Sequence, residues 1–169
     1  TKLRRKGLIT RGSHPVLFCL NDRNAVGEDD IQDGDTLNAK VVEYAGFKFP
    51  FEDSFIIVSA QNPRDITNAT KILINPEKTY VKAKVDDEKW MISQKAAEKL
   101  MFQDHSVKIL EEFDGKTLTG KTCRNPVNNT HVPILSSDTV DHDSATGITY
   151  DTNKQETENP EPVSYTHLT

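Results

Sequence analysis

The chain has 169 residues, of which 35% are hydrophobic and 28% charged, and its net charge is −5. Its longest apolar run, at residues 55–58, is far shorter than the ~18 residues of a membrane-spanning helix, so we expect no membrane partner. The acidic balance argues against an autonomous DNA-binding protein, which needs a net basic field. Two cysteines are too few for a disulfide framework, which is typical of the reducing cytoplasm.

The first half of the chain predicts short strands separated by turns. Strands are expected at 15–19, within 41–51 as an edge strand, at 55–58 and at 71–74. The acidic, turn-rich stretch 21–35 predicts an irregular loop. Between the two apolar strands, Asn62 can cap a short helix and Pro63 can occupy its first position.

The second half begins with the clearest local signal, a hairpin of residues 80–85 and 89–92 around the turn Asp86-Asp87. Ser93 is expected to cap a helix from Gln94 to Met101. The apolar face predicted for this helix comprises Ala96, Ala97, Leu100 and Met101. Further strands are expected at 107–113, 131–135, 139–140 and 148–150. Many short strands with few helices predict an α+β fold built on a curved sheet or barrel.

Residues 75–115, NPEKTYVKAKVDDEKWMISQKAAEKLMFQDHSVKILEEFDG, closely resemble the editing domain of archaeal-type leucyl-tRNA synthetases. The similarity continues through KTLTGKTCRNPV at 116–127 and HVPILSSDTVDHDSATG at 131–147. Upstream, KGLITRGSHPVLFC at 6–19 and AVGEDD at 25–30 are similar to the segment that leads into that domain. The resemblance implies the fold of a class I synthetase editing domain, a curved β-sheet or β-barrel with a few flanking helices.

The resemblance covers about residues 4–148 and implies three parts. Residues 1–35 would be a junction leading from the synthetase core, and 36–150 an editing domain that is incomplete at its C-terminal end. Residues 151–169 have nothing to bury, and we expect a disordered or artefactual tail. Because residue 1 is not Met, the chain is expected to be a piece of a longer protein.

The implied parent is a class I leucine–tRNA ligase that joins leucine to its tRNA with ATP and Mg²⁺ in the cytoplasm. Its editing domain hydrolyses wrongly charged tRNA(Leu), because a hydrophobic pocket separates side chains differing by one methyl group by only about 1–3 kcal/mol. The implied partners are the acceptor end of tRNA(Leu) and the remainder of the synthetase chain. The HIGH-type and KMSKS-type motifs of the synthetic site are absent, so we expect the segment alone to be inactive in ligation and to need no cofactor.

The family's threonine-rich stretch, T-x-R-P-x-T-x-x-G-x-T-N, is only partly matched when counted back from Asn75. Its proline falls on Pro63 and its last threonine on Thr70, while Thr146 and Gly147 are implied to border the pocket. The altered positions are Ala60 and Asp65 in place of threonines, Asn62 in place of arginine and Asn68 in place of glycine. Editing is therefore expected to be impaired, since those hydroxyls and that cation would hold the ester and a water.

A second departure follows Gly147. There the resemblance implies an apolar strand and a proline-histidine stretch ending in an aspartate that grips the substrate's α-amino group, but Thr149-Tyr-Asp-Thr-Asn-Lys154 does not match it. If this chain lacks the family's apolar strand, a sheet edge is expected to stay unpaired. The alternative function is a non-catalytic, degenerate editing-fold module that binds the tRNA end or has only a structural role.

Two weaker signals concern metals. Cys19, followed by Asp22, is a weak remnant of a C-x-x-C zinc knuckle, and a metal-free cysteine is the favoured interpretation. Asp138, Asp141 and Asp143 could share acid–base roles or hold a divalent ion, but a solvated acidic loop beside the pocket is favoured. No metal site is therefore assigned.

Overall fold

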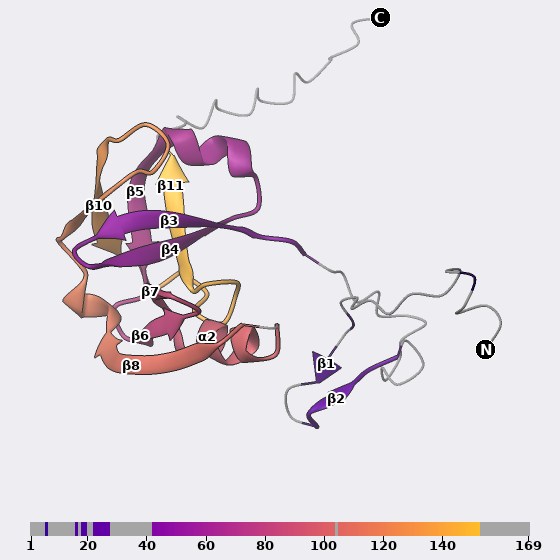
Figure 1. Cartoon of the computed structure of the whole chain (residues 1–169). Coiled ribbons are helices and arrows are strands. Elements are labelled where there is room, and N and C mark those ends of the chain that lie inside the picture. The colour runs from indigo at the N-terminus through magenta and orange to yellow at the C-terminus, as the bar shows by residue number, and fades with distance from the viewer. Residues whose placement is uncertain are drawn as a thin grey trace, which may run out of the picture. The chain divides into compact units, whose positions relative to one another are not determined.

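The computed structural model describes residues 42–103 and 105–152, together with Lys6, Val16, 18–19 and 22–27 (Figure 1). The chain divides into two compact units, Thr1–Val41 and Val42–Thr169. In the first unit, strand β1 (Phe18–Cys19) pairs antiparallel with β2 (Asn24–Ala25). The strand expected within 15–19 is confirmed at its end, β2 interrupts the expected loop, and most of the proposed junction lies outside the described residues.

The larger unit contains a five-stranded mixed sheet. In order across the sheet its strands are β3 (Ala45–Phe51), β4 (Ser54–Ala60), β7 (Glu88–Ser93), β6 (Thr79–Val85) and β8 (Val107–Asp114). Only β4 and β7 run parallel, joined through Phe55 and Trp90. The predicted edge position of β3 and the predicted β6–β7 hairpin are confirmed, with Asp86 in the left-handed region at φ 52°.

A four-stranded mixed sheet completes the unit. Its order is β11 (Ile148–Thr152), β5 (Ala69–Ile74), β10 (His131–Ser136) and β9 (Thr122–Arg124). In Figure 1, β5 and β11 cross behind β3 and β4. The three-residue β9 was not predicted, because it is too short to show alternation. The prediction of a strand at 139–140 was wrong. Val140 lies in a turn instead, and its backbone amide donates to the Ser137 carbonyl.

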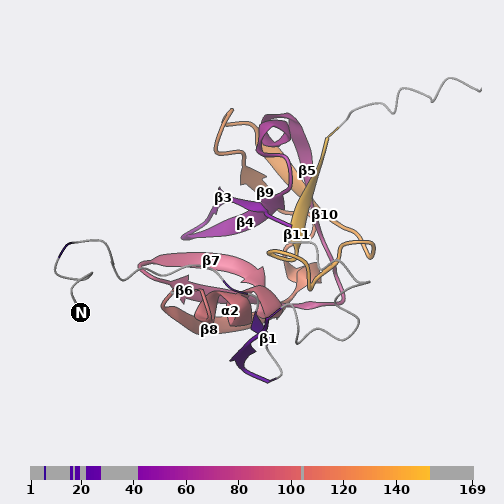
Figure 2. The ribbon, with the colours of Figure 1, turned by 90° about the vertical axis from the view of Figure 1, so that its right-hand side faces the viewer.

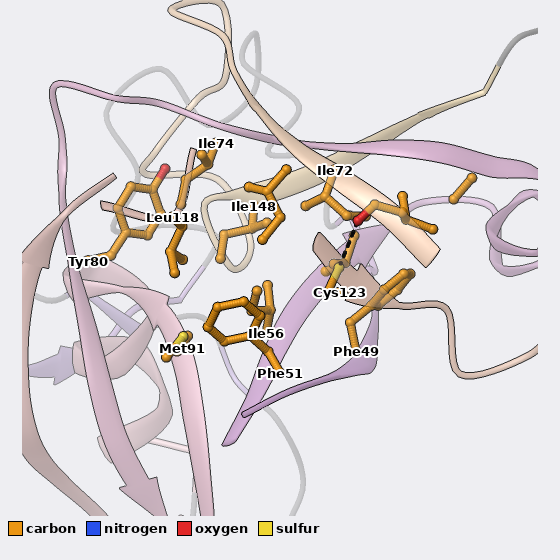
Figure 3. Packing of buried hydrophobic residues seen from close by; sticks show 14 of the residues in the cluster. Phe49, Phe51, Ile56, Ile72, Ile74, Tyr80, Met91, Leu118, Cys123 and Ile148 are labelled. Atoms are coloured by element: carbon orange, nitrogen blue, oxygen red, sulfur yellow. Dashed lines mark hydrogen bonds between the residues drawn. The ribbon is translucent and has the colours of Figure 1, made fainter. Parts of the chain in front are cut away.

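The main hydrophobic core lies between the two sheets. Phe49, Ile56 and Met91 of the five-stranded sheet meet Ile72 and Ile148 of the four-stranded sheet, and all are buried (Figure 3). Burying this apolar surface is the dominant stabilising term. The two sheets form no closed barrel within the described residues, so the α+β class is confirmed in its open form.

The opposite face of the five-stranded sheet packs against helix α2 (Gln94–Met101), as Figure 2 shows. The predicted cap is confirmed, because the Ser93 Oγ accepts from the Ala96 amide at 3.1 Å. Ala97 is buried, but Met101 is 46% exposed, so its assignment to the apolar face was wrong. At 100° per residue, Met101 lies about 90° around the helix from the centre of the buried face.

Candidate functional site

A cavity of about 530 Å³ lies where the end of β4 faces β11; we call it the β4–β11 cavity. The Ser59 Oγ donates to the Ile148 carbonyl oxygen at 2.8 Å and ties the two strands together. The cavity is lined by Tyr44, Ser59, Ala60, Gln61, Asn62, Asp65, Leu73, Thr139, Val140, Asp141, Ser144 and residues 147–152. Since these strands belong to different sheets, the cavity opens at the seam between them.

The structure brings together half of the residues that the sequence singled out. Ala60, Asn62, Asp65 and Gly147 line the β4–β11 cavity, whereas Pro63 does not. Asn68 and Thr70 line a separate space of about 570 Å³, the threonine hollow, formed by Thr67, Asn68, Ala69, Thr70, Asn128, Thr130, His131 and Thr152. Thr146 lines a third hollow beside α2. Sequence counting could not separate these surfaces, because it does not show which way each side chain points.

Asn62 and Asp65 are held at the cavity by the short helix η2 (Pro63–Asn68). Asn62 caps this helix as predicted, its Oδ1 accepting from the Arg64 amide at 3.3 Å. Its Nδ2 donates to the Asp65 carboxylate at 2.9 Å, so the two altered positions contact each other. The Tyr150 hydroxyl donates to the Asn62 carbonyl at 3.4 Å, and burial, then the Asp65 charge, raise the pKa of Tyr150.

Gly147 forms the bend that leads into β11, and its backbone requires glycine. Its φ is +71°, and a Cβ there would lie 2.6 Å from the Ser93 Cβ and 2.8 Å from the His142 carbonyl oxygen. The residue is buried, and its own carbonyl accepts from the Tyr80 hydroxyl at 2.8 Å. Glycine therefore lets the chain pass close to Ser93 before it enters the cavity wall.

The strand expected at 148–150 is confirmed as β11, whereas the expectation of an unpaired sheet edge after Gly147 was wrong. β11 pairs with β5 from Ile148 to Thr152, so β5 is not left as an unpaired edge. The strand also reaches two residues beyond the boundary proposed for the domain. Asp151 thereby lines the cavity, where the Lys71 ammonium at 2.8 Å lowers the pKa of its carboxyl.

Three polar residues at the cavity were not predicted. The Tyr44 hydroxyl accepts from Gln61 Nε2 at 3.0 Å and from Ser144 Oγ at 3.3 Å. These two hydrogen bonds, the one from Ser144 more strongly, lower the pKa of Tyr44. Tyr44 precedes β3 and Ser144 lies 100 residues later, so no local motif links them.

The charge of the β4–β11 cavity is negative. Asp65, Asp141 and Asp151 line it, and no lysine or arginine does. Such a surface favours an ammonium group over a phosphate. No group of three or more His, Cys, Asp or Glu among the described residues is placed to hold a metal ion. The Cys19 thiol donates to Asp22 at 3.1 Å.

The chain is similar to two archaeal proteins over most of its length. It is 39% identical over 146 residues to a leucine–tRNA ligase of Methanothrix thermoacetophila, and 41% identical over 160 residues to one of Methanocaldococcus jannaschii. Each match takes in 86% of this chain but only 15% and 17% of those proteins. The chain thus spans about a sixth of the length of these relatives. No protein-family model matches it. No helix in its described part is long and apolar enough to cross a membrane.

Solved structures provide a comparison of fold. The crystal structure of "GlLeuRS-CP1" matches with a TM-score of 0.54 at 21% identity, over 59% of this chain and 41% of that one. The editing domain of the cytosolic leucyl-tRNA synthetase of P. knowlesi matches with a TM-score of 0.50 at 17% identity, over 58% and 44%. The alternative, a non-catalytic, degenerate editing-fold module, is not favoured. The chain is therefore a homologue of archaeal leucyl-tRNA synthetases over a segment that has the fold of a leucyl-tRNA synthetase editing domain.

Proposed function

We propose that this chain is the editing segment of a leucyl-tRNA synthetase and that its β4–β11 cavity receives the aminoacylated 3′ end of tRNA(Leu). One observation carries this proposal. Gly147 lines the same cavity as Ala60, Asn62 and Asp65 of one short segment far from it in the chain, and all four were singled out by resemblance alone. The cavity's three carboxylates, of which Asp151 is already paired with Lys71, suit the ammonium group that every aminoacyl ester carries.

The reaction at this site is water attack on the ester bond, and the residues present perform it poorly. Ala60 offers a methyl group where a hydroxyl would orient the ester or the water. Asn62 offers a neutral amide where a guanidinium would stabilise the developing oxyanion. The Asp65 carboxylate adds a negative charge beside that oxyanion, although it could accept a proton from water. We therefore propose that the cavity binds the aminoacyl end and hydrolyses it slowly.

The parent protein would be the ligase itself. It would use ATP and Mg²⁺ in a synthetic domain outside this chain, and it would act in the cytoplasm. The remaining synthetase chain and tRNA(Leu) would be the partners of this segment. The editing segment itself needs neither ATP nor metal, because ester hydrolysis requires only a positioned water and hydrogen-bond donors.

The test is deacylation of isoleucyl-tRNA(Leu) by the 169-residue chain. We expect little acceleration over spontaneous hydrolysis, and at least about a tenfold gain in the triple variant Ala60→Thr/Asn62→Arg/Asp65→Thr, since a single oriented donor is worth a factor of ~10² or more.

The matched control is Gln103→Arg/Asp87→Thr, which makes the same charge change at two exposed positions away from the cavity. It should give no gain. Equal rates in the triple variant and the control would refute the assignment of the cavity as the hydrolytic site.

A further inference from the structure

Tyr44, which no motif of the sequence singles out, lies beside the altered positions of the β4–β11 cavity. Strands β3 and β4 pair antiparallel, and Ala45 is the register partner of Ala60. Tyr44 is therefore next to Gln61 across the strands, and the two side chains are hydrogen-bonded. Because Gln61 separates Ala60 from Asn62, the Tyr44 hydroxyl reaches the part of the cavity where the family's threonine and arginine are replaced.

The Tyr44 hydroxyl carries a proton that no acceptor in the described part of the chain takes. The hydroxyl makes two side-chain hydrogen bonds and accepts in both, from Gln61 Nε2 at 3.0 Å and from Ser144 Oγ at 3.3 Å. A phenol oxygen has one proton of its own in addition to the lone pairs that accept. Tyr44 is 39% exposed, so a ligand in the cavity can receive this proton in a hydrogen bond.

Three neighbouring polar side chains of the cavity already donate to the protein. The Ser59 hydroxyl donates to the Ile148 carbonyl at 2.8 Å, and the Tyr150 hydroxyl to the Asn62 carbonyl at 3.4 Å. The Asn62 amide donates to the Asp65 carboxylate at 2.9 Å. No lysine or arginine lines the cavity, so a carbonyl oxygen of a ligand has to be bound there by a neutral donor.

The two accepted hydrogen bonds also make Tyr44 a better donor. The bond from Ser144, and then the bond from Gln61, lower the pKa of the Tyr44 hydroxyl because they stabilise its phenolate form. A hydroxyl that is polarised in this way forms a stronger hydrogen bond to a third group. Burial and the charge of Asp141 oppose the lowering of the pKa, so the Asp141 carboxylate lies near enough to act on the phenol.

An aminoacyl ester matches the pairing of a carboxylate with a phenol. Its ammonium group is attached to the carbon next to the carbonyl carbon, so the groups that bind the two must also be neighbours. The ammonium has only protons to offer and suits Asp141, whereas the carbonyl oxygen has only lone pairs and suits Tyr44. The geometry points to the Tyr44 hydroxyl as the donor that holds the ester carbonyl oxygen of the aminoacyl end. This inference rests on the proposed function, because it takes that end to lie in the β4–β11 cavity.

The same contact contributes to the slow hydrolysis proposed above. Water adds to the ester carbonyl carbon and loses a proton to solvent, while the carbonyl oxygen gains negative charge. A fixed donor to that oxygen stabilises the charge. The bond to the ribose oxygen then breaks, and the ribose oxygen takes up a proton from solvent. Tyr44 keeps its own proton throughout, so its role is that of a hydrogen-bond donor rather than of a general acid.

The experiment measures, by isothermal titration calorimetry, the binding of a phosphate-free isoleucyl-adenosine amide to the 169-residue chain. The amide keeps the carbonyl oxygen of the ester but resists hydrolysis. The variant Tyr44→Phe keeps the aromatic ring and removes only the hydroxyl. We expect its affinity for the amide to be about three- to tenfold lower than that of the wild type, the effect of one neutral hydrogen bond.

The matched control changes the ligand. In the corresponding thioamide, sulfur replaces the carbonyl oxygen and is a weak acceptor, so the wild type and Tyr44→Phe should bind it within about twofold of each other. If Tyr44→Phe weakens both ligands equally, the hydroxyl acts through the structure of the cavity and the inference is overturned. Equal affinities of both chains for the amide would also overturn it and leave the cavity proposal intact. If the wild type binds neither ligand, the cavity proposal fails and this inference fails with it.

Discussion

The Tyr80 hydroxyl donates a 2.8 Å hydrogen bond to the carbonyl oxygen of Gly147, and it accepts one from the Asn75 amide at 3.1 Å. Tyr80 belongs to β6 of the five-stranded sheet, whereas Gly147 precedes β11 of the four-stranded sheet. The Tyr80 side chain is fully buried, and this burial raises the pKa of its hydroxyl, which remains a donor at neutral pH. One phenol therefore fixes the bend that begins the cavity wall.

Replacing Tyr80 with Phe leaves the Gly147 carbonyl and the Asn75 amide without their buried partner. We expect the free energy of unfolding to fall by about 1–3 kcal/mol, the cost of an unsatisfied buried polar group. Urea denaturation measures this loss. Tyr150→Phe is the control, because its hydroxyl makes a longer hydrogen bond of 3.4 Å at a more exposed position, and it should cost less than about 0.5 kcal/mol. A Tyr80→Phe variant as stable as the control would contradict the role of this hydrogen bond.

Gly147→Ala tests the close approach of the bend to Ser93. The new Cβ would lie 2.6 Å from the Ser93 Cβ in addition to adopting φ +71°, so a loss of more than about 3 kcal/mol is expected. Gly120→Ala separates the two effects, since φ is +83° there but nothing lies within 4 Å of the added Cβ. That control should cost about 1–2 kcal/mol, the left-handed penalty alone. Thermal or urea unfolding of both variants gives the comparison, and equal losses would rule out the clash.

Asp53 should contribute a pH-dependent part of the stability in acid. Hydrogen bonds from Lys82 at 2.6 Å and Lys89 at 2.5 Å lower the pKa of Asp53 from 3.8 to about 2. A carboxyl whose pKa is lower in the folded state stabilises the fold above its unfolded pKa and loses that effect as pH falls towards its folded pKa. The melting temperature of the wild type should therefore fall more steeply than that of Asp53→Asn between pH 4 and pH 2. Added salt should reduce the difference, because Asp53 is exposed. Parallel curves at low salt would count against the ion pairs.

The two cysteines should differ sharply in reactivity. Burial raises the pKa of the Cys123 thiol to about 11, and the side chain lies in the core between the sheets. Cys19 is partly exposed. Because the thiolate is the reactive form, a thiol reagent at pH 8 should label Cys19 at once and Cys123 only after unfolding. Mass spectrometry of the native chain should find one label, and rapid double labelling would contradict the packing of β9.

The sequence was informative where local chemistry decides the structure. The β6–β7 hairpin, the Ser93 cap and the Asn62–Pro63 helix start follow from turn and capping residues within a few positions of one another. It was uninformative where pairing is long-range. β9 is recognised only through its pairing with β10, because it has no apolar pattern of its own. The two residues by which β11 extends beyond the expected 148–150 likewise follow from its pairing with β5.

The same distinction holds for the site. Ala60, Asn62 and Asp65 could be found because a resemblance fixes their spacing along one segment. Tyr44 could not, since its hydrogen bonds to Gln61 and Ser144 depend on the packing of segments far apart in the chain. Thr70 fits the family's spacing, yet its hydroxyl donates to the Asp151 carbonyl at 3.2 Å on the side of the threonine hollow.

The most direct test of the account is to map the binding of the phosphate-free isoleucyl-adenosine amide by ¹H–¹⁵N NMR on the 169-residue chain. The account predicts saturable shifts at the amides of Ser59–Asn62, Asp65 and residues 147–152, with little change along α2 and β8. Loss of these shifts in Asp65→Asn/Asp151→Asn would identify the carboxylates as the partners of the ammonium group. Shifts centred on another surface, or none at millimolar amide, would contradict the claim that the β4–β11 cavity receives the aminoacyl end.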